Sequence, residues 1–202
     1  MAMFTIASGP AAAAPVRLVA FGDSLTAGYN LPTASGFAAK LEAALKAKGY
    51  DVTVVNAGVS GDTTAAALAR FDWSIPKDAD AVIVELGAND MLRGLDPDIP
   101  LKNLTEILTR LKARDVPVLL AGMRAAPNFG VDYQRRFDAL YPQLAAEFGV
   151  PLYPFFLEGV AGNRGLNQRD GLHPTAAGVD RIVAGILPYV ERLVASARAA
   201  AQ

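Results

Sequence analysis

Two short segments of this sequence carry the residue types of acyl-transfer chemistry. Ser24 lies in FGDSLTAGY, and His173, the only histidine of the chain, lies in DGLH. A serine hydroxyl needs a base to take its proton, and a neutral imidazole is the usual base. Asp170 precedes His173 by three residues, so a single turn could place its carboxylate on the imidazole Nδ1. Alternatively, Asp170 could cap the last predicted helix or pair with Arg169 or Arg181.

A serine nucleophile also needs hydrogen-bond donors where the carbonyl oxygen becomes negative. Three sources are expected: the backbone N–H of Ser24, the backbone N–H of Gly58 and the side-chain amide of Asn89. Gly58 lies in NAGVSGDTT, where a missing side chain lets another group approach the backbone closely. Asn89 lies in ELGANDMLRG and offers two N–H donors.

Four other residues near these segments are expected to have structural roles. Asp23 is expected to hold the turn through hydrogen bonds to the backbone, without a direct part in the chemistry. Asp62 and Thr63 are expected to cap the helix that follows the second predicted strand. Trp73, the single tryptophan, is expected to be a packing residue.

Alternating strand and helix patterns must position these residues. Apolar runs predict strands at 17–21, 52–56, 81–86, 117–122 and 152–155, and helical patterns fall at 36–48, 63–71, 100–114, 133–148 and 175–198. This alternation predicts parallel βαβ units in a three-layer α/β/α sandwich. The carboxyl ends of parallel strands meet at one edge, so Ser24, Gly58, Asn89 and the loop before the last helix should converge there. Loop 123–133 follows the fourth predicted strand and should border the same edge.

The bulk composition limits the classes of function. With 202 residues, 52% hydrophobic and 19% charged, the chain predicts one folded domain over residues 16–202, preceded by a flexible leader over residues 1–15. Nineteen basic and twenty acidic residues leave a net charge of −1, which argues against a nucleic-acid partner. No apolar run approaches the roughly 18 residues of a membrane span, so no integral membrane segment is expected.

The absence of cysteine narrows the chemistry further. It excludes disulfides, thiolate catalysis and cysteine metal sites. One histidine argues against zinc or iron sites, which generally use several nitrogen or sulfur ligands. We therefore expect neither a metal nor a cofactor. The sequence does not predict an oligomeric state.

Four segments of the chain resemble, in order, the conserved blocks of the SGNH (GDSL) hydrolases: FGDSLTAGY, NAGVSGDTT, ELGANDMLRG and DGLHPTAAG. The family's Ser, Gly, Asn and His correspond in this resemblance to Ser24, Gly58, Asn89 and His173. Asp170 matches the aspartate three residues before the histidine. The chain resembles most the bacterial periplasmic acyl-CoA thioesterase/lysophospholipase and arylesterase subgroup, through VELGANDMLRG and VPLYPFFLEGV.

This resemblance covers about residues 16–190 and implies a flavodoxin-like fold with a five-stranded parallel sheet. It implies a serine ester hydrolase, of the arylesterase, acyl-CoA thioesterase or lysophospholipase type, that cleaves small-molecule carboxylic esters or thioesters through an acyl-serine intermediate. It also implies a periplasmic or secreted location, although the chain shows no clear signal peptide and a cytoplasmic location stays open.

Two alternatives remain at this point. A carbohydrate O-acetylesterase could use the same catalytic residues; exposed aromatic residues near the site would favour it, and an apolar groove would favour acyl chains. A flavodoxin-like module that binds an anion or nucleotide belongs to another class. The chain lacks both G-x-G-x-x-G and the P-loop pattern, which argues against that module.

Overall fold

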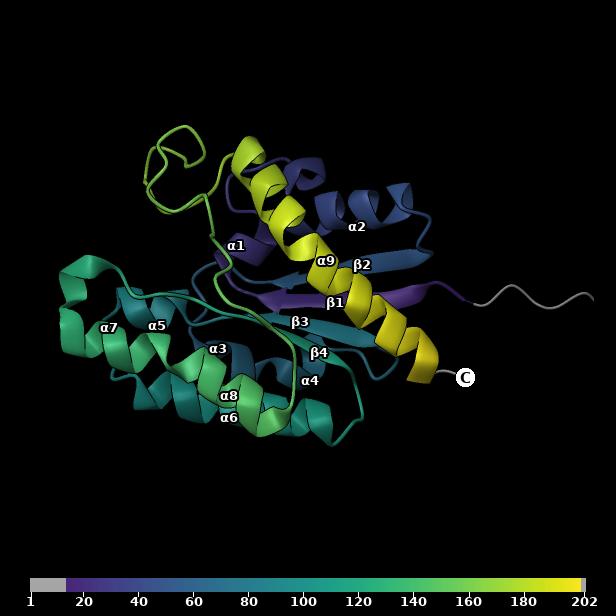
Figure 1. Ribbon diagram of the computed structural model, residues 1–202, viewed down its shortest axis with the longest axis horizontal. Helices are drawn as coiled ribbons and strands as arrows, with labels where there is room; N and C mark the ends of the chain where they lie inside the picture. The colour runs from purple at the N-terminus through teal and green to yellow at the C-terminus, as the bar shows by residue number, and fades with distance from the viewer. Residues whose placement is uncertain (1–13, 201–202) are drawn as a thin grey trace, which may run out of the picture.

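A five-stranded parallel sheet forms the centre of the protein (Figure 1). The computed structural model describes residues 14–200, so the predicted leader, residues 1–15, lies outside the described residues except for its last two. The strands lie in the order β2-β1-β3-β4-β5, and all neighbouring pairs are parallel, which confirms the predicted sheet. The strands are β1 (Val16–Gly22), β2 (Val52–Gly58), β3 (Ala81–Glu85), β4 (Val118–Ala121) and β5 (Leu152–Tyr153).

The burial of each strand follows from its place in the sheet. All five residues of β3 are buried, including Val82 and Ile83, because helices cover both faces of this inner strand. At the edge, β2 instead alternates at its start, with Val52 and Val54 buried and Thr53 exposed. The continuous apolar run and the alternating run in the sequence therefore correspond to an inner strand and an edge strand.

Helices cover the two faces of the sheet, which gives the predicted three layers (Figure 1). Two helices pack on one face, α2 (Phe37–Ala47) and α9 (Ala176–Ala200). The other face carries α3 (Thr64–Ala69), α4 (Phe71–Ser74), α6 (Asp98–Lys112) and α8 (Leu140–Phe148). Among residues 14–200, no helix has both the length and the apolar character needed to cross a bilayer.

The helices differ from the predicted ones mainly where they are short or broken. The predicted helix 63–71 is divided into α3 and α4 at Arg70, and the predicted helix 133–148 is divided into α7 (Val131–Asp138) and α8 at Ala139. Two unpredicted helices, α1 (Ser24–Ala27) and α5 (Ala88–Leu92), directly follow β1 and β3. Segments of four or five residues are too short to show a helical period in the sequence.

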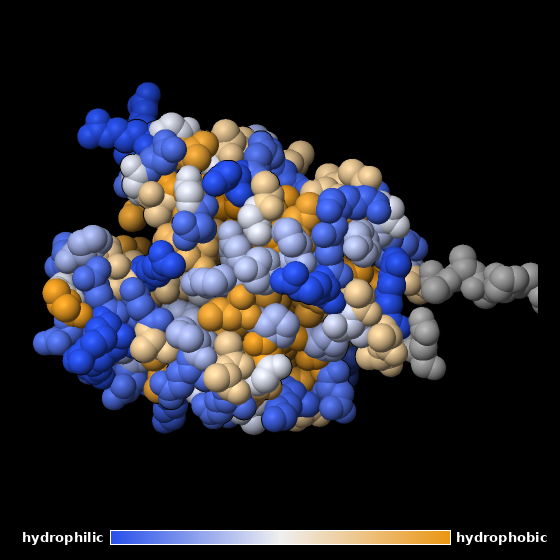
Figure 2. All heavy atoms as spheres, in the orientation of Figure 1, coloured by the Kyte–Doolittle hydropathy of each residue, from blue (hydrophilic) through white to orange (hydrophobic). Residues whose placement is uncertain are grey.

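The carboxyl ends of the strands lie at the left of Figure 1, on the same side as α1, α5, α7 and the loop that precedes α9. In the same orientation, Figure 2 shows a notch at this edge with apolar residues inside it. The sheet thus brings the segments after β1, β2 and β3 to one place, as the strand pattern predicts.

Candidate active site

Ser24 is the first residue of α1, two residues after the end of the inner strand β1. Asp23 is the N-cap of this helix, and its Oδ1 accepts a hydrogen bond of 3.0 Å from the N–H of Leu25, which confirms its expected role in the turn. Within residues 14–200, nothing accepts a hydrogen bond from the backbone N–H of Ser24. The nucleophile candidate therefore lies on a rigid turn with a donor still available.

His173 and Asp170 complete a chain of hydrogen bonds to Ser24. His173 Nε2 lies 2.8 Å from Ser24 Oγ, and its Nδ1 lies 2.7 Å from Asp170 Oδ2. The other oxygen, Asp170 Oδ1, accepts the backbone N–H groups of Leu172 and His173 at 2.9 and 3.0 Å. Asp170 thus contacts the imidazole and not an arginine, and α9 begins six residues after it, at Ala176.

The same contacts determine the charge of Asp170. Desolvation tends to raise its pKa, but the hydrogen bonds from His173 and Leu172 outweigh it and lower the pKa of Asp170 to about 2. The carboxylate is therefore ionised throughout the neutral range. An ionised carboxylate on Nδ1 keeps that nitrogen protonated and leaves Nε2 free to accept the proton of Ser24.

Two residues that sequence reasoning missed, Tyr29 and Gln168, contact His173 or the segment around it. The Tyr29 ring packs on the His173 ring, with centroids 4.5 Å apart. Gln168 Nε2 donates to the backbone oxygens of Tyr29 and Pro174, both at 2.9 Å. The Gln168 N–H also donates to the His173 carbonyl at 2.7 Å. These contacts connect the segment after α1, which contains Tyr29, to the loop before α9, which contains Gln168 and His173.

Asn89 lies in α5 and faces the segment that follows β2. Its Nδ2 donates to the carbonyl of Asp62 at 2.9 Å and, over a longer distance of 3.2 Å, to Asp23 Oδ2. Asn89 and Ser24 both line the same pocket. The structure therefore brings the predicted side-chain donor to the nucleophile.

The backbone N–H of Gly58, an expected oxyanion donor, already has an acceptor within the protein. This N–H donates to Asn56 Oδ1 at 3.0 Å and is therefore engaged. A Cβ at Gly58 would lie 2.3 Å from the backbone nitrogen of Ala27, so the close approach that requires glycine is that of α1. Gly61 lies three residues further on, with a φ of +87°, and nothing within residues 14–200 accepts a hydrogen bond from its N–H. The next residue, Asp62, supplies the carbonyl that holds Asn89.

Arg70 joins three segments of the site and gave no signal in the sequence. Its Nη2 donates to the Gly22 carbonyl at 2.8 Å, and its Nη1 donates to the Ala57 carbonyl at 2.9 Å. Its Nε pairs with Asp62 Oδ2 at 2.5 Å, and the guanidinium lies 4.6 Å from the Phe21 ring centroid. The side chain is only 18% exposed, so these contacts are shielded from water. One guanidinium thereby holds the ends of β1 and β2 and the loop that positions Asn89.

The pairing of Asp62 with Arg70 corrects one structural expectation. Asp62 does not cap α3. Thr63 is the N-cap of this helix, with its side chain accepting the N–H of Ala66 at 3.3 Å.

Two buried carboxyl groups lie beneath the nucleophile turn. Glu85 ends β3, is fully buried, and accepts the hydroxyl hydrogen of Thr26 at 2.7 Å. Burial, and then the charge of Asp23, raises the pKa of Glu85 well above its usual value. Burial likewise raises the pKa of Asp23 to about 7, although the hydrogen bond from the Leu25 N–H opposes the shift.

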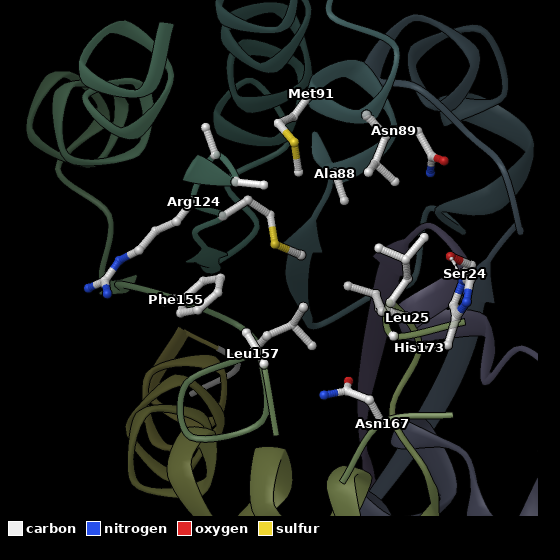
Figure 3. A pocket seen from close by; sticks show the side chains of 18 of the residues that line it. Ser24, Leu25, Ala88, Asn89, Met91, Arg124, Phe155, Leu157, Asn167 and His173 are labelled. Carbon is white, nitrogen blue, oxygen red and sulfur yellow. Dashed lines mark hydrogen bonds between the residues drawn. The ribbon is translucent and has the colours of Figure 1, made fainter. Parts of the chain in front are cut away.

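A mostly apolar pocket of about 520 Å³ opens beside the serine (Figure 3). Ser24 and His173 lie at one side of it, and Phe155 and Arg124 lie at the other. Residues 123–127 of the fourth loop line it, which confirms that this loop borders the site. Within residues 14–200, histidine and carboxylate side chains form no group of three that could hold a metal ion. The other apolar walls come from Leu25, Ala88, Met91, Leu92, Leu157, Ala161 and Leu172.

Comparisons with known proteins agree with this arrangement. Residues 20–181 match the model of the GDSL-like lipase/acylhydrolase family. The chain is 40% identical over 183 residues to "Esterase TesA" of Pseudomonas aeruginosa, covering 90% of this chain and 91% of that protein. It is 42% identical over 164 residues to "Thioesterase 1/protease 1/lysophospholipase L1" of Escherichia coli K12, covering 81% and 77%. The crystal structure of AlinE4, an SGNH-hydrolase family esterase, superposes with a TM-score of 0.76 at 48% identity, covering 90% of this chain and 98% of that one.

Proposed function

Because the chain belongs to the GDSL-like lipase/acylhydrolase family and is an ester hydrolase, we propose that it cleaves carboxylic esters and thioesters through an acyl-enzyme on Ser24. The observation that carries this proposal is the unbroken contact from Ser24 Oγ through His173 to Asp170, at 2.8 and 2.7 Å. These three side chains have the geometry of nucleophile, base and orienting carboxylate.

In the first step, Ser24 Oγ attacks the acyl carbonyl carbon while its proton passes to His173 Nε2. The carbonyl π electrons move onto oxygen, and the ionised Asp170 stabilises the imidazolium that forms. The tetrahedral intermediate then collapses, and His173 gives the proton to the departing alcohol or thiol. A water molecule, deprotonated by His173 in its turn, then attacks the acyl carbonyl. As the bond to Ser24 Oγ breaks and the acid leaves, His173 returns the proton to Oγ.

Three donors would hold the oxyanion in this mechanism. The Ser24 N–H has no other acceptor within residues 14–200, and Asn89 can exchange its longer contact, 3.2 Å to Asp23 Oδ2, for the substrate oxygen. Gly61 supports the third role better than Gly58, because the Gly58 N–H already donates to Asn56. Losing one such donor lowers turnover about 10²–10³-fold.

The pocket favours acyl chains over acetylated sugars. Its walls are mostly aliphatic, and among its lining residues only Phe155 and His173 carry an aromatic ring. Apolar walls of this kind bury a hydrocarbon chain, at about 0.8 kcal/mol for each CH₂ group. The names of the relatives, which include esterases and a thioesterase/lysophospholipase, support the same choice over a carbohydrate O-acetylesterase.

Turnover of a p-nitrophenyl ester by two single variants tests the proposed catalytic residues. Ser24→Ala and His173→Ala should each remove most of the turnover and leave the circular dichroism spectrum unchanged. His173 is the only histidine, so no second imidazole can take over its role. Near-normal turnover by the His173→Ala protein would contradict the mechanism.

A periplasmic or secreted location is supported by the family resemblance and stays part of the proposal. Fractionation of the native cells, with esterase activity measured in each fraction, tests it. Activity confined to the cytoplasmic fraction would contradict it.

A further inference from the structure

Asn167 places one buried polar atom in the wall of an otherwise mostly apolar pocket. Its side chain is 7% exposed and belongs to the loop between β5 and α9. It lines the pocket together with Leu25, Leu157 and His173 (Figure 3). Within residues 14–200, its Oδ1 is buried and has no hydrogen-bond partner.

The orientation of this amide is determined by its nitrogen. Asn167 Nδ2 donates to the backbone carbonyls of Val160 and Asn163, at 2.6 and 2.9 Å. A reversed amide would place Oδ1 against these two carbonyl oxygens and lose both hydrogen bonds. The acceptor atom is therefore the one left without a partner.

An unpaired buried acceptor destabilises the folded state, because it has lost its hydrogen bonds to water and gained none in the protein. An apolar side chain at position 167 would remove that penalty. Most of the other residues that line the pocket do have apolar side chains. Gly162 and Gly171 line the same pocket, and a Cβ at either position would meet nothing within 4 Å.

We propose that Asn167 Oδ1 accepts a hydrogen bond from a hydroxyl group on the acyl chain of the substrate. The enzyme therefore favours hydroxyacyl esters over unsubstituted esters of the same length. A carboxylate oxygen or an ether oxygen could not take this place, because Oδ1 accepts hydrogen bonds and cannot donate them. This inference rests on the proposed function, because it takes the pocket beside Ser24 as the site of the acyl chain.

The test compares kcat/KM for p-nitrophenyl octanoate with kcat/KM for its 2-hydroxy, 3-hydroxy and 8-hydroxy derivatives. For at least one hydroxyl position, the wild-type protein should prefer the hydroxy ester about five- to tenfold, as expected for one neutral hydrogen bond. Asn167→Leu should lose this preference. An equal ratio in the wild-type and Asn167→Leu proteins, or a wild-type ratio of one at every position, would overturn the proposal.

Asn163→Ala is the matched control, because it disturbs the same loop and keeps the Asn167 amide. Asn163 Oδ1 accepts the N–H of Gly165 at 3.0 Å, and its removal should leave the hydroxyacyl preference unchanged. Each ratio is taken within one protein, so a general loss of catalytic power cancels. If Ser24→Ala hydrolysed all the esters normally, the proposed function would fail instead, and the two failures are thereby distinguishable.

Two further measurements complete the test. A hydroxyl on the leaving group is probed with 1-octanoylglycerol: if Asn167→Leu reduces turnover of this substrate alone, the proposal for the acyl chain is wrong.

Calorimetric titration of the wild-type protein needs no variant to fold. The preferred hydroxyoctanoate should bind about fivefold more tightly than octanoate, as for one hydrogen bond, and equal affinities would overturn the proposal.

Discussion

At the nucleophile, three side chains form a series of contacts that ends in the carboxylate of Asp170. Ser24 is almost fully buried, whereas the Asp170 side chain is 37% exposed. The carboxylate stays ionised in spite of its partial desolvation because His173 and Leu172 donate to it. In the proposed mechanism it holds the imidazole in one tautomer and stabilises its charged form.

Asp170→Asn should lower kcat for a p-nitrophenyl ester about 10³–10⁴-fold at pH 8, because an amide can favour the wrong tautomer of His173. Since the pKa of Asp170 is about 2, its protonation has no part in any loss of activity between pH 8 and 5. The control is Asp180→Asn, which removes a carboxylate paired with Lys40 on the surface and should keep full activity. A loss smaller than tenfold in Asp170→Asn would contradict this role.

Residue types and spacing were enough to propose Ser24, His173 and Asp170 as the catalytic residues, because a chain with one histidine leaves a single choice of imidazole base for the serine. They were not enough to place Trp73, which is 87% exposed, so the expected packing role is wrong. Its position in the four-residue helix α4 shows no periodicity that would reveal which side faces solvent. The engaged N–H of Gly58 depends on the side chain of Asn56, which no pattern of glycines discloses.

At the scale of the elements, short helices and loops hold the site against the sheet. The five strands could be predicted because long apolar runs identify them, whereas α1 and α5 are too short to leave a periodic signal. Arg70 lies at the junction of α3 and α4, and its hydrogen bonds reach residues up to 48 positions away in the sequence. Such contacts depend on the completed fold, so the sequence alone could not reveal them.

Arg70→Met should lower kcat about 10–100-fold with a smaller effect on KM, because the loops that carry Ser24 and hold Asn89 lose their common anchor. The free energy of unfolding should fall by about 1–3 kcal/mol, since buried carbonyls and Asp62 lose their donor. Arg70→Lys keeps the charge but loses the planar guanidinium. Its kcat and its free energy of unfolding should lie between those of the wild-type and Arg70→Met proteins.

The matched control for Arg70 is Arg110→Met. Arg110 is 39% exposed and pairs with Glu106 on the surface of α6, so its loss should change stability by no more than about 0.5 kcal/mol. Steady-state kinetics and urea unfolding measure both effects. An Arg70→Met protein with the kcat of the Arg110→Met protein would show that Arg70 does not position the site.

At the scale of the whole molecule, a buried carboxyl group beneath the Ser24 turn should make the free energy of unfolding depend on pH. Glu85 is the last residue of the central strand β3, and burial raises its pKa well above the usual 4.5. The folded protein therefore holds this proton where the unfolded chain releases it. The stability from this group is complete below about pH 4.5 and is lost as the pH rises toward the folded-state pKa.

Glu85→Gln should remove this dependence, because glutamine resembles the protonated acid and cannot ionise. The difference in unfolding free energy, variant minus wild type, should grow by about 1.4 kcal/mol per pH unit above pH 4.5, up to the pKa of Glu85 in the folded protein. Urea unfolding of both proteins from pH 4 to 9 measures it. A difference that does not change with pH would mean that Glu85 is ionised in the folded state.

The most direct test of the whole account is labelling with a fluorophosphonate followed by peptide mass spectrometry. An activated serine attacks the phosphorus and displaces fluoride, whereas a module that merely binds anions or nucleotides should not react. We predict one adduct per chain, located on Ser24, and very slow labelling of His173→Ala. An unlabelled wild-type protein, or an adduct on any other residue, would contradict the assignment of Ser24 as the nucleophile.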